Sequence, residues 1–166
     1  MNKQKGFTLI ELVVVIIILG ILAVTAAPKF INLQSDARKS TVEGMKGAFQ
    51  GANTLVYSKA AIQGKEKDAN STNANNVDIS GDGTDDLKAV YGYVKGEITE
   101  VSKILDIDTG EWAVVVPGSG VASAATVEII IHPADITPSS TKRCFVEYTG
   151  ATVNKLPVYD VQADDC

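Results

Sequence analysis

An unbroken apolar segment near the start of the chain constrains the fold more than any other feature of the sequence. From Phe7 to Ala27 the only charged residue is Glu11, and the segment ends before Pro28. About 20 predominantly apolar residues are enough for a helix to cross a bilayer. A lone span in lipid must satisfy its backbone hydrogen bonds internally, so its β-branched residues do not make it a strand. The sequence therefore predicts a transmembrane helix over 7–27.

The start of this segment distinguishes it from an ordinary anchor. Glu11 lies inside the apolar region, where a carboxylate costs roughly 2.5–3.5 kcal/mol, so it is expected to have a partner and a function. The preceding residues, Met1 to Gly6, include Lys3 and Lys5. A secretory signal is cut beyond its apolar region, at a site of small residues. No small-x-small site follows this segment, so the expected cleavage lies before it.

The chain resembles the class IVa type IV prepilins in the run from Gly6 to Glu11, in the long apolar segment and in Pro28. The resemblance implies that a prepilin peptidase cuts between Gly6 and Phe7 and methylates the new amino group of Phe7. It also implies an inner-membrane precursor, which an inner-membrane assembly platform builds into a homo-oligomeric helical filament. That filament would pass through an outer-membrane secretin and become an extracellular pilus.

The segments from Gly20 to Phe30 and from Asp36 to Thr41 are similar to the major pilins of the mannose-sensitive haemagglutinin (MSHA) pilus. This closer similarity covers about the first third of the chain. It implies a major structural subunit that serves adhesion, surface attachment and biofilm formation. A glycan on a host or another surface is the kind of receptor that it suggests.

The resemblance gives assembly roles to Phe7, Glu11, Gly20 and Pro28. Glu11 of a joining subunit would pair with the Phe7 amine of a subunit already in place, which neutralises both charges and fixes the axial register. In the alternative, Glu11 pairs only with its own Phe7 and favours the first helical turn. Pro28 removes a backbone donor and clashes with the carbonyl of Val24. The helix is therefore expected to be weakest from Gly20 to Pro28 and kinked there in an isolated subunit. The resemblance implies that the same segment is locally unwound in a filament.

Beyond Pro28 the apolar residues recur every three or four positions, which predicts an amphipathic continuation of the helix to Ile62, ending near Gly64. The expected apolar face comprises Phe30, Leu33, Ala37, Met45, Ala48, Ala52, Leu55 and Val56. Gly44, Gly47 and Gly51 each cost about 1 kcal/mol relative to alanine in a helix interior. Their expected benefit is the close approach of a sheet to that face.

Residues 63–86 are polar and poor in apolar side chains, which is typical of an exposed loop. Four of them, Asp78, Ser80, Asp82 and Asp86, follow the spacing of an EF-hand-like loop with a glycine after the third, and their oxygen atoms suit calcium. The last position of the pattern is Ala89 instead of the bidentate glutamate. Two interpretations stay open, a weak structural calcium site or an acidic turn without a metal. No cofactor is required.

The rest of the chain alternates short apolar runs with turn residues. Helical spacing predicts a short helix over 97–105, and strands are expected at 111–116, 126–132, 143–149 and 157–161. An antiparallel meander packed on the amphipathic helix gives an α+β fold, the type IV pilin fold. The expected organisation is a leader (1–6), a long helix (7–62) and one globular domain (63–166).

Cys144 and Cys166 are the only cysteines. An exported chain meets an oxidising compartment, where an even number of cysteines usually forms disulfides. Their bridge would close a loop of roughly 20 residues, contribute about 3 kcal/mol and bound the region 144–166. With one histidine in the chain, the cysteine spacing has no zinc pattern.

Charge and motifs bear on two function classes, nucleic-acid binding and catalysis. A net charge of −5 argues against nucleic acid as the main partner, because phosphate binding needs a basic face. No catalytic motif is present, and His132 precedes Pro133 at the end of a strand, where a structural or solvent-facing role is more common than general base catalysis. The chain is not expected to be an enzyme.

Two other non-enzymatic functions are alternatives to a pilus subunit. Major pseudopilins of type II secretion share the Gly6 to Glu11 signature and a calcium loop, but they generally lack a C-terminal disulfide, so the cysteines favour a pilus. A monomeric anchored binding module would need neither Glu11 nor a helix that continues so far into the domain.

Overall fold

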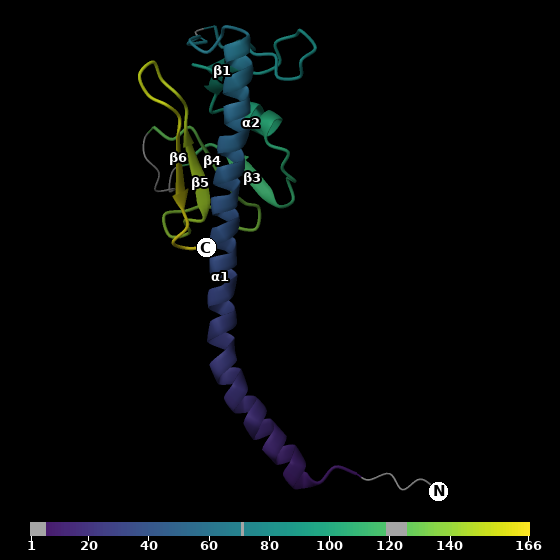
Figure 1. Cartoon of the computed structure of the whole chain (residues 1–166). Coiled ribbons are helices and arrows are strands. Elements are labelled where there is room, and N and C mark those ends of the chain that lie inside the picture. Colours follow the sequence, from purple (N-terminus) through teal and green to yellow (C-terminus); the bar gives the residue numbers. More distant parts are fainter. Residues whose placement is uncertain (1–5, 71, 119–125) are drawn as a thin grey trace, which may run out of the picture. The chain divides into compact units, whose positions relative to one another are not determined.

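The computed structural model describes residues 6–70, 72–118 and 126–166, without the side chains of residues 31 and 32. One long helix is followed by a small hairpin, a short helix and a four-stranded antiparallel sheet (Figure 1). The elements are α1 (Leu9–Ile62), β1 (Ala89–Val90), β2 (Tyr93–Val94), α2 (Ile98–Ile104), β3 (Trp112–Val115), β4 (Ile129–Pro133), β5 (Phe145–Thr149) and β6 (Val158–Gln162). The chain divides into two compact units, Met1–Ala37 and Arg38–Cys166, and α1 contributes to both.

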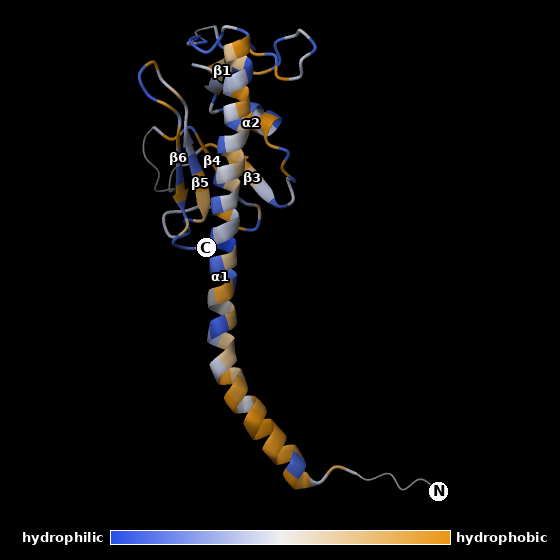
Figure 2. Cartoon of the chain, viewed as in Figure 1, coloured by the Kyte–Doolittle hydropathy of each residue, from blue (hydrophilic) through white to orange (hydrophobic). Residues whose placement is uncertain are grey.

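The first unit contains the apolar half of α1. This half is almost uniformly hydrophobic (Figure 2), and α1 is long and apolar enough to cross a membrane. Helical structure continues without interruption from Gly20 through Pro28. Near the proline, a side chain adds a hydrogen bond to the helix backbone: Thr25 Oγ1 donates to the Leu22 carbonyl at 3.0 Å. The expected unwinding of this segment in a filament stays a prediction.

The second unit is built around the sheet, whose strands follow one another in the order β3-β4-β5-β6. Each strand pairs with the next in antiparallel register, for example Ile131 with Val146 and Tyr148 with Tyr159. The four predicted strands and the helix predicted over 97–105 are thus confirmed, with ends shifted by a few residues at most. The core contains, among others, Val42, Phe49, Val56, Leu87, Val94, Val101, Ile129, Ile131, Val146 and Tyr148.

The buried face of α1 differs in part from the prediction. Val42, Met45, Phe49, Val56 and Ala60 are buried, and they repeat at helical spacing. Ala48 and Leu55 were expected among them, but both are exposed, Leu55 by 70%. The spacing of the apolar residues sets the period of the buried stripe, whereas the sheet selects which face is covered, and it covers the face that carries Phe49.

The interpretation of the helix glycines is wrong. A Cβ atom added at Gly44, Gly47 or Gly51 would meet no neighbouring atom within 4 Å. All three lie on the exposed side of α1. The sheet therefore does not require glycine at any of these positions.

The hairpin of β1 and β2 was not predicted. Its turn residues Tyr91 and Gly92 both have positive φ, 51° and 80°. Positive φ at both central residues is typical of two-residue hairpin turns, usually at Asn-Gly or Asp-Gly. Glycine is needed at the second position, because a Cβ there would lie 2.8 Å from the ring of Tyr57.

Candidate functional site

The first turn of α1 is closed by a reciprocal pair of hydrogen bonds. Thr8 precedes the helix, and its backbone N–H and its hydroxyl both donate to Glu11 Oε2, each at 2.8 Å. The Glu11 N–H donates back to Thr8 Oγ1 at 3.3 Å. This is a capping box, in which a threonine and a glutamate three residues later satisfy orphan N–H groups of a helix start. Thr8-x-x-Glu11 before an apolar run matches the sequence signal of this cap, which was not among the predicted features.

The capping box fixes the position of the Glu11 carboxylate and determines which of its two oxygens is already hydrogen-bonded. Both bonds from Thr8 reach Oε2, and no hydrogen bond from the described part of the chain reaches Oε1. Glu11 is exposed, and the side chains that follow it along the helix are aliphatic. One carboxylate oxygen therefore remains able to accept from a cation of another molecule.

The predicted cleavage site lies just before the cap. Gly6, Phe7 and Thr8 are not helical, and Phe7 is 90% exposed. A peptide bond in a non-helical, exposed segment can be bound in extended form by a peptidase. Lys3 and Lys5 of the predicted leader lie outside the described residues.

A buried polar cluster that the sequence analysis missed joins α1 to the hairpin and the sheet. Asn53 is fully buried, and its Nδ2 donates to the hydroxyls of Tyr148 at 3.2 Å and Tyr159 at 2.6 Å. Its Oδ1 accepts from the Val94 N–H at 2.8 Å, while the Tyr148 hydroxyl donates to the Val94 carbonyl at 2.6 Å. The ring of Phe49 packs against both tyrosines, with centroids 4.8 and 5.2 Å away.

Burial changes the acidity of the two tyrosines in this cluster. Desolvation raises the pKa of Tyr148 far above its usual range, and it raises the pKa of Tyr159 to about 12. Both hydroxyls therefore stay neutral and keep their hydrogen bonds at physiological pH. The cluster holds the globular unit together and has no reactive group.

The acidic loop, residues 78–86, uses its carboxylates to bind its own backbone. Asp78 accepts from the N–H groups of Gly81 at 2.6 Å and Gly83 at 2.8 Å, and these bonds hold the pKa of Asp78 below its usual range. Burial works to raise the pKa of Asp86, but hydrogen bonds from Ile79 and Ser80 bring it below its usual value. The folded loop therefore favours ionised Asp78 and Asp86.

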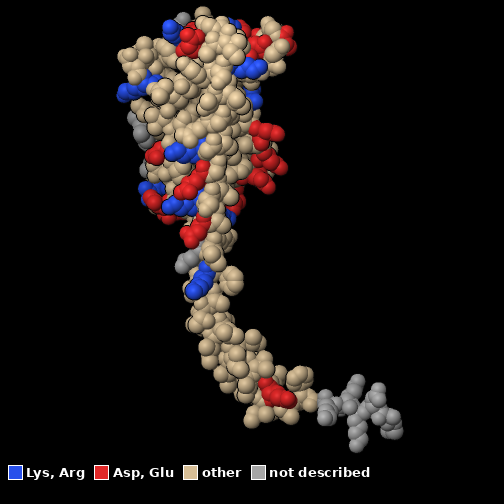
Figure 3. Space-filling model, in the orientation of Figure 1, with Lys and Arg blue, Asp and Glu red and all other residues tan. Residues whose placement is uncertain are grey.

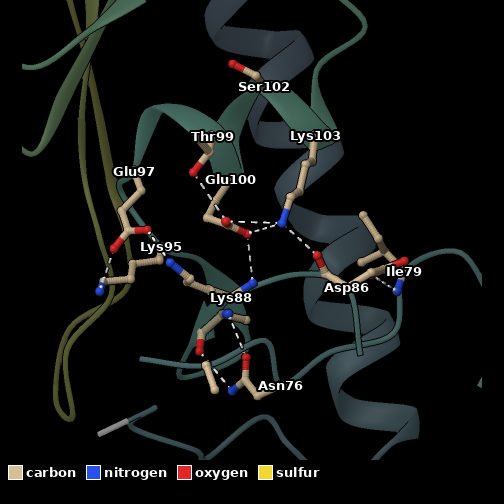
Figure 4. Close-up of polar contacts among 12 residues, drawn as sticks. Asn76, Ile79, Asp86, Lys88, Lys95, Glu97, Thr99, Glu100, Ser102 and Lys103 are labelled. Carbon is tan, nitrogen blue, oxygen red and sulfur yellow. Dashed lines mark hydrogen bonds and ion pairs between the residues drawn. The ribbon is translucent and has the colours of Figure 1, made fainter. Parts of the chain in front are cut away.

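The end of the acidic loop is attached to α2 through a buried carboxylate (Figure 4). Glu100, only 2% exposed, accepts from the Lys88 N–H at 2.9 Å and from Lys103 Nζ at 3.0 Å. Lys103 Nζ also donates to the Asp86 carbonyl at 2.7 Å. Asn76 binds the Ala89 backbone in both directions. These contacts attach the end of the loop to α2 and to β1.

The predicted calcium ligands are only partly brought together. Ser80 Oγ donates to Asp78 Oδ1 at 3.2 Å, whereas Asp82 Oδ1 accepts from the Thr84 N–H. Among the described residues, no three or more His, Cys, Asp or Glu side chains are arranged to hold a metal ion. Both interpretations, a weak calcium site and an acidic turn without a metal, stay predictions.

The predicted disulfide region is closed by covalent and ionic contacts. Cys144 and Cys166 form a disulfide with Cα atoms 4.9 Å apart. Beside it, Arg143 pairs with Asp164 at 2.9 Å and with Asp165 at 3.2 Å. The C-terminal tail is thus attached to the start of β5.

His132, the only histidine of the sequence, is buried and hydrogen-bonded to the backbone. It is 7% exposed, and its Nδ1 lies 2.8 Å from the carbonyl oxygen of Pro133, which can only accept. A buried imidazole that donates to the backbone is not placed to act as a general base on a substrate.

The charged groups are distributed unequally along the molecule (Figure 3). Lysine, arginine, aspartate and glutamate side chains are spread over the globular unit. In the described part of the apolar half of α1, Glu11 is the single charged residue. An exposed apolar helix with one acidic group at its start is suited to lipid or to packing against other helices, and not to water.

Comparison with known proteins agrees with these features. A family model described as "Prokaryotic N-terminal methylation motif" matches residues 1–27. The chain is 41% identical over 63 residues to the type IV narrow pilus major component PilA5 of Thermus thermophilus, a match that covers 38% of this chain and 51% of that protein. It is 37% identical over 75 residues to the type IV major pilin protein PilA of Myxococcus xanthus, covering 45% of this chain and 31% of that protein.

The similarity to two fimbrial proteins extends over most of their length. A fimbrial protein of Pseudomonas aeruginosa is 33% identical over an alignment of 134 positions, and the match covers 68% of this chain and 85% of that protein. No solved structure matches the chain. The N-terminal motif, the capped apolar helix, the four-stranded sheet and this extended similarity together show that the chain belongs to the type IV pilin family.

Proposed function

We propose that this chain is the major structural subunit of an MSHA-like type IV pilus. The precursor is held in the inner membrane by 7–27, and a prepilin peptidase cuts it between Gly6 and Phe7 and methylates Phe7. An assembly platform then adds subunits to a filament, which leaves through a secretin and serves adhesion, surface attachment and biofilm formation. The observation that carries the proposal is the exposed apolar helix, whose only acid lies in its first turn.

The free oxygen of Glu11 supports a role in joining subunits. Once Phe7 becomes the N-terminus, its methylated amine is a cation at the edge of the same apolar layer. The Thr8 cap keeps Glu11 Oε2 occupied, so Oε1 can accept from the Phe7 amine of a neighbouring subunit. This pairing neutralises two charges that are costly in lipid and sets the depth at which a subunit joins.

Two substitutions separate this role from helix capping. Glu11→Gln keeps a side chain that can close a capping box but removes the charge. Thr8→Ala removes the two hydrogen bonds of the cap that use the Thr8 hydroxyl and keeps the charge. If pairing fixes the register, Glu11→Gln lowers the amount of subunit in filaments sheared from cells, while Thr8→Ala lowers it much less. Normal piliation with Glu11→Gln and loss with Thr8→Ala would assign Glu11 to the cap alone.

Processing is tested on the same filaments. The intact mass of the subunit should lack Met1 to Gly6 and carry one additional methyl group at Phe7. An unprocessed chain in assembled filaments would contradict the proposed pathway.

The MSHA assignment needs its own test. Cells that carry the filament should agglutinate erythrocytes, and free mannose should inhibit this. The Cys144–Cys166 disulfide favours a pilus over a type II secretion pseudopilus. Loss of protein secretion without loss of surface filaments, after deletion of this subunit, would support the pseudopilus instead.

Weak calcium binding in the acidic loop is tested by calorimetric titration of the detergent-solubilised chain. A binding heat that Asp82→Ala abolishes would support calcium. Equal heats for both proteins would leave the acidic turn without a metal.

A further inference from the structure

A cleft beside the hairpin of β1 and β2 has features that a ligand site requires. Its volume is about 540 Å³, within the roughly 300–1,000 Å³ of typical ligand pockets. The residues that line this tyrosine cleft include Tyr57, Glu66, Lys67, Tyr91, Tyr93 and Asn154. We propose that the tyrosine cleft binds a sugar ring. The inference deepens the proposed function, since it gives surface attachment a site on the subunit, and it rests on that function for this role alone.

The tyrosine cleft has an aromatic wall. The rings of Tyr57, near the end of α1, and Tyr93, on β2, stack with their centroids 4.9 Å apart. Tyr57 is 37% exposed, and Tyr93 is partly exposed. Tyrosine rings give a large and rigid contact surface at a low cost in conformational entropy, and their hydroxyls form hydrogen bonds at its edge. The apolar C–H face of a sugar ring can pack against such a wall.

Tyr91, in the hairpin turn, has a strained backbone. Its φ of 51° is uncommon for a bulky side chain, and asparagine or aspartate is usual at this position of a two-residue turn. The backbone is held there because the Tyr91 N–H donates to the Asp68 carbonyl at 2.7 Å. Among the described residues, no hydrogen bond or ring contact engages the Tyr91 side chain. Strained residues cluster at ligand sites, and a ligand that contacts this ring would explain why a tyrosine is kept here.

Glu66 supplies an acceptor that lacks a donor. It lies in the turn after α1, next to the hairpin, since a Cβ at Gly92 would lie 3.2 Å from the Glu66 Cα atom. Glu66 Oε2 is buried and accepts no hydrogen bond from the described residues. A buried polar atom without a partner is rare in folded proteins and requires an explanation. The last side-chain torsion of glutamate rotates over a broad range, so this carboxylate can turn an oxygen towards a donor in the cleft.

The charges in the tyrosine cleft select the class of ligand. Lys67 and Lys155 also line it, and both are exposed without an ion-pair partner among the described residues. A cationic ligand would meet these two ammonium groups, and an anionic ligand would meet Glu66. A hydroxyl group both donates and accepts, so it can pair with the carboxylate and with an ammonium group. A neutral ring with several hydroxyls and an apolar face satisfies all three requirements.

Saturation-transfer NMR of the full chain tests the site. The chain is solubilised in a detergent that has no sugar headgroup, and the probes are the methyl glycosides of glucose, galactose, mannose and N-acetylglucosamine. Argininamide serves as a cationic probe of similar size. Saturation of the aromatic protons should transfer to ring C–H protons of at least one glycoside and not to argininamide.

Two variants and a matched control locate the binding. Glu66→Gln keeps the shape of the side chain but weakens the acceptor, and it should lower the transfer to the bound glycoside about threefold or more. Tyr91→Asn should lower it at least as much and leave the melting temperature unchanged or higher, because asparagine adopts positive φ more readily. Glu111→Gln should have no effect, since Glu111 is exposed and does not line the cleft.

The outcomes distinguish the site from the proposed function. Equal transfer for the wild-type chain and both cleft variants would overturn the sugar site, as would transfer to argininamide alone or to no probe. A lower melting temperature of Tyr91→Asn with an unchanged sugar signal would show that the ring only stabilises the fold, and would also overturn it. If the chain binds no glycoside but forms filaments in cells, the site is wrong and the pilus function stands. If it binds a glycoside but forms no filament in cells with an assembly system, the pilus function fails and the site stands.

Discussion

Asn53→Ala should be among the most destabilising single substitutions in the globular unit. Asn53 is fully buried and connects α1 to β2, β5 and β6 through three hydrogen bonds. The substitution leaves the Val94 N–H, in a residue that is 1% exposed, without its acceptor. The Tyr148 hydroxyl still donates to the Val94 carbonyl, and the part-buried Tyr159 hydroxyl can turn to water.

The magnitude follows from these partners. A buried donor left unpaired costs about 1–3 kcal/mol, and the space left by the missing amide adds to this cost. We therefore expect a loss of roughly 2–4 kcal/mol, a large part of the 5–15 kcal/mol that is typical of a folded protein. Tyr159→Phe removes one hydroxyl but leaves Asn53 with Tyr148, and should cost about 0.5–1.5 kcal/mol.

Urea unfolding of the full chain in detergent, followed by the fluorescence of Trp112, measures these losses. Gln50→Ala is the matched control, because Gln50 is exposed on the same helix and should change stability by less than about 0.5 kcal/mol. The double variant of Asn53 and Tyr159 gives their coupling. A cost of Asn53→Ala no larger than that of Gln50→Ala would refute the reasoning, because it would mean that water replaces the amide at no cost.

Three further predictions concern stability. Replacing Cys144 and Cys166 by serine should lower the unfolding free energy by about 3 kcal/mol, the loop-entropy value for a bridge that spans 22 residues, as measured by urea unfolding. Burial, together with Asp160 opposite it on β6, raises the pKa of Glu147, so the folded state binds the proton more tightly and stability falls as pH rises above the ordinary value of 4.5. Glu147→Gln should accordingly stabilise the chain near neutral pH and progressively less as the pH falls towards that value, which pH-dependent melting checks. Gly47→Ala should raise the unfolding free energy by roughly 0.5–1 kcal/mol, since its Cβ meets no atom within 4 Å, and a loss of stability would show a contact that the single chain lacks.

Local patterns were sufficient to predict most of the fold. The apolar segment predicted the first half of α1, and short runs bounded by glycine or proline predicted the four strands of the sheet. These features depend on residues that are close together in the chain. The strand order followed for the same reason, because each strand pairs with the next one in sequence.

Features that depend on distant residues could not be predicted in this way. The exposure of Leu55 and the burial of Phe49 depend on which face of α1 the sheet covers. Asn53 binds residues 41, 95 and 106 positions away, and a lone asparagine in a helix gives no sign of such partners. The capping box was different, because Thr8 and Glu11 lie three residues apart and their spacing alone could have revealed it.

Strand β6 forms one edge of the sheet, and such an edge can pair with another copy when chains are held at high local concentration. Among the described strands β6 pairs with β5 alone, so its other edge presents backbone groups that could pair with a strand of another molecule. Asp160 stands in the middle of β6, and its carboxylate accepts from the neighbouring Val161 N–H at 3.0 Å. Joining two such edges would bring the carboxylates of two copies together and displace this bond, so growth by sheet extension into amyloid-like aggregates is opposed at this edge.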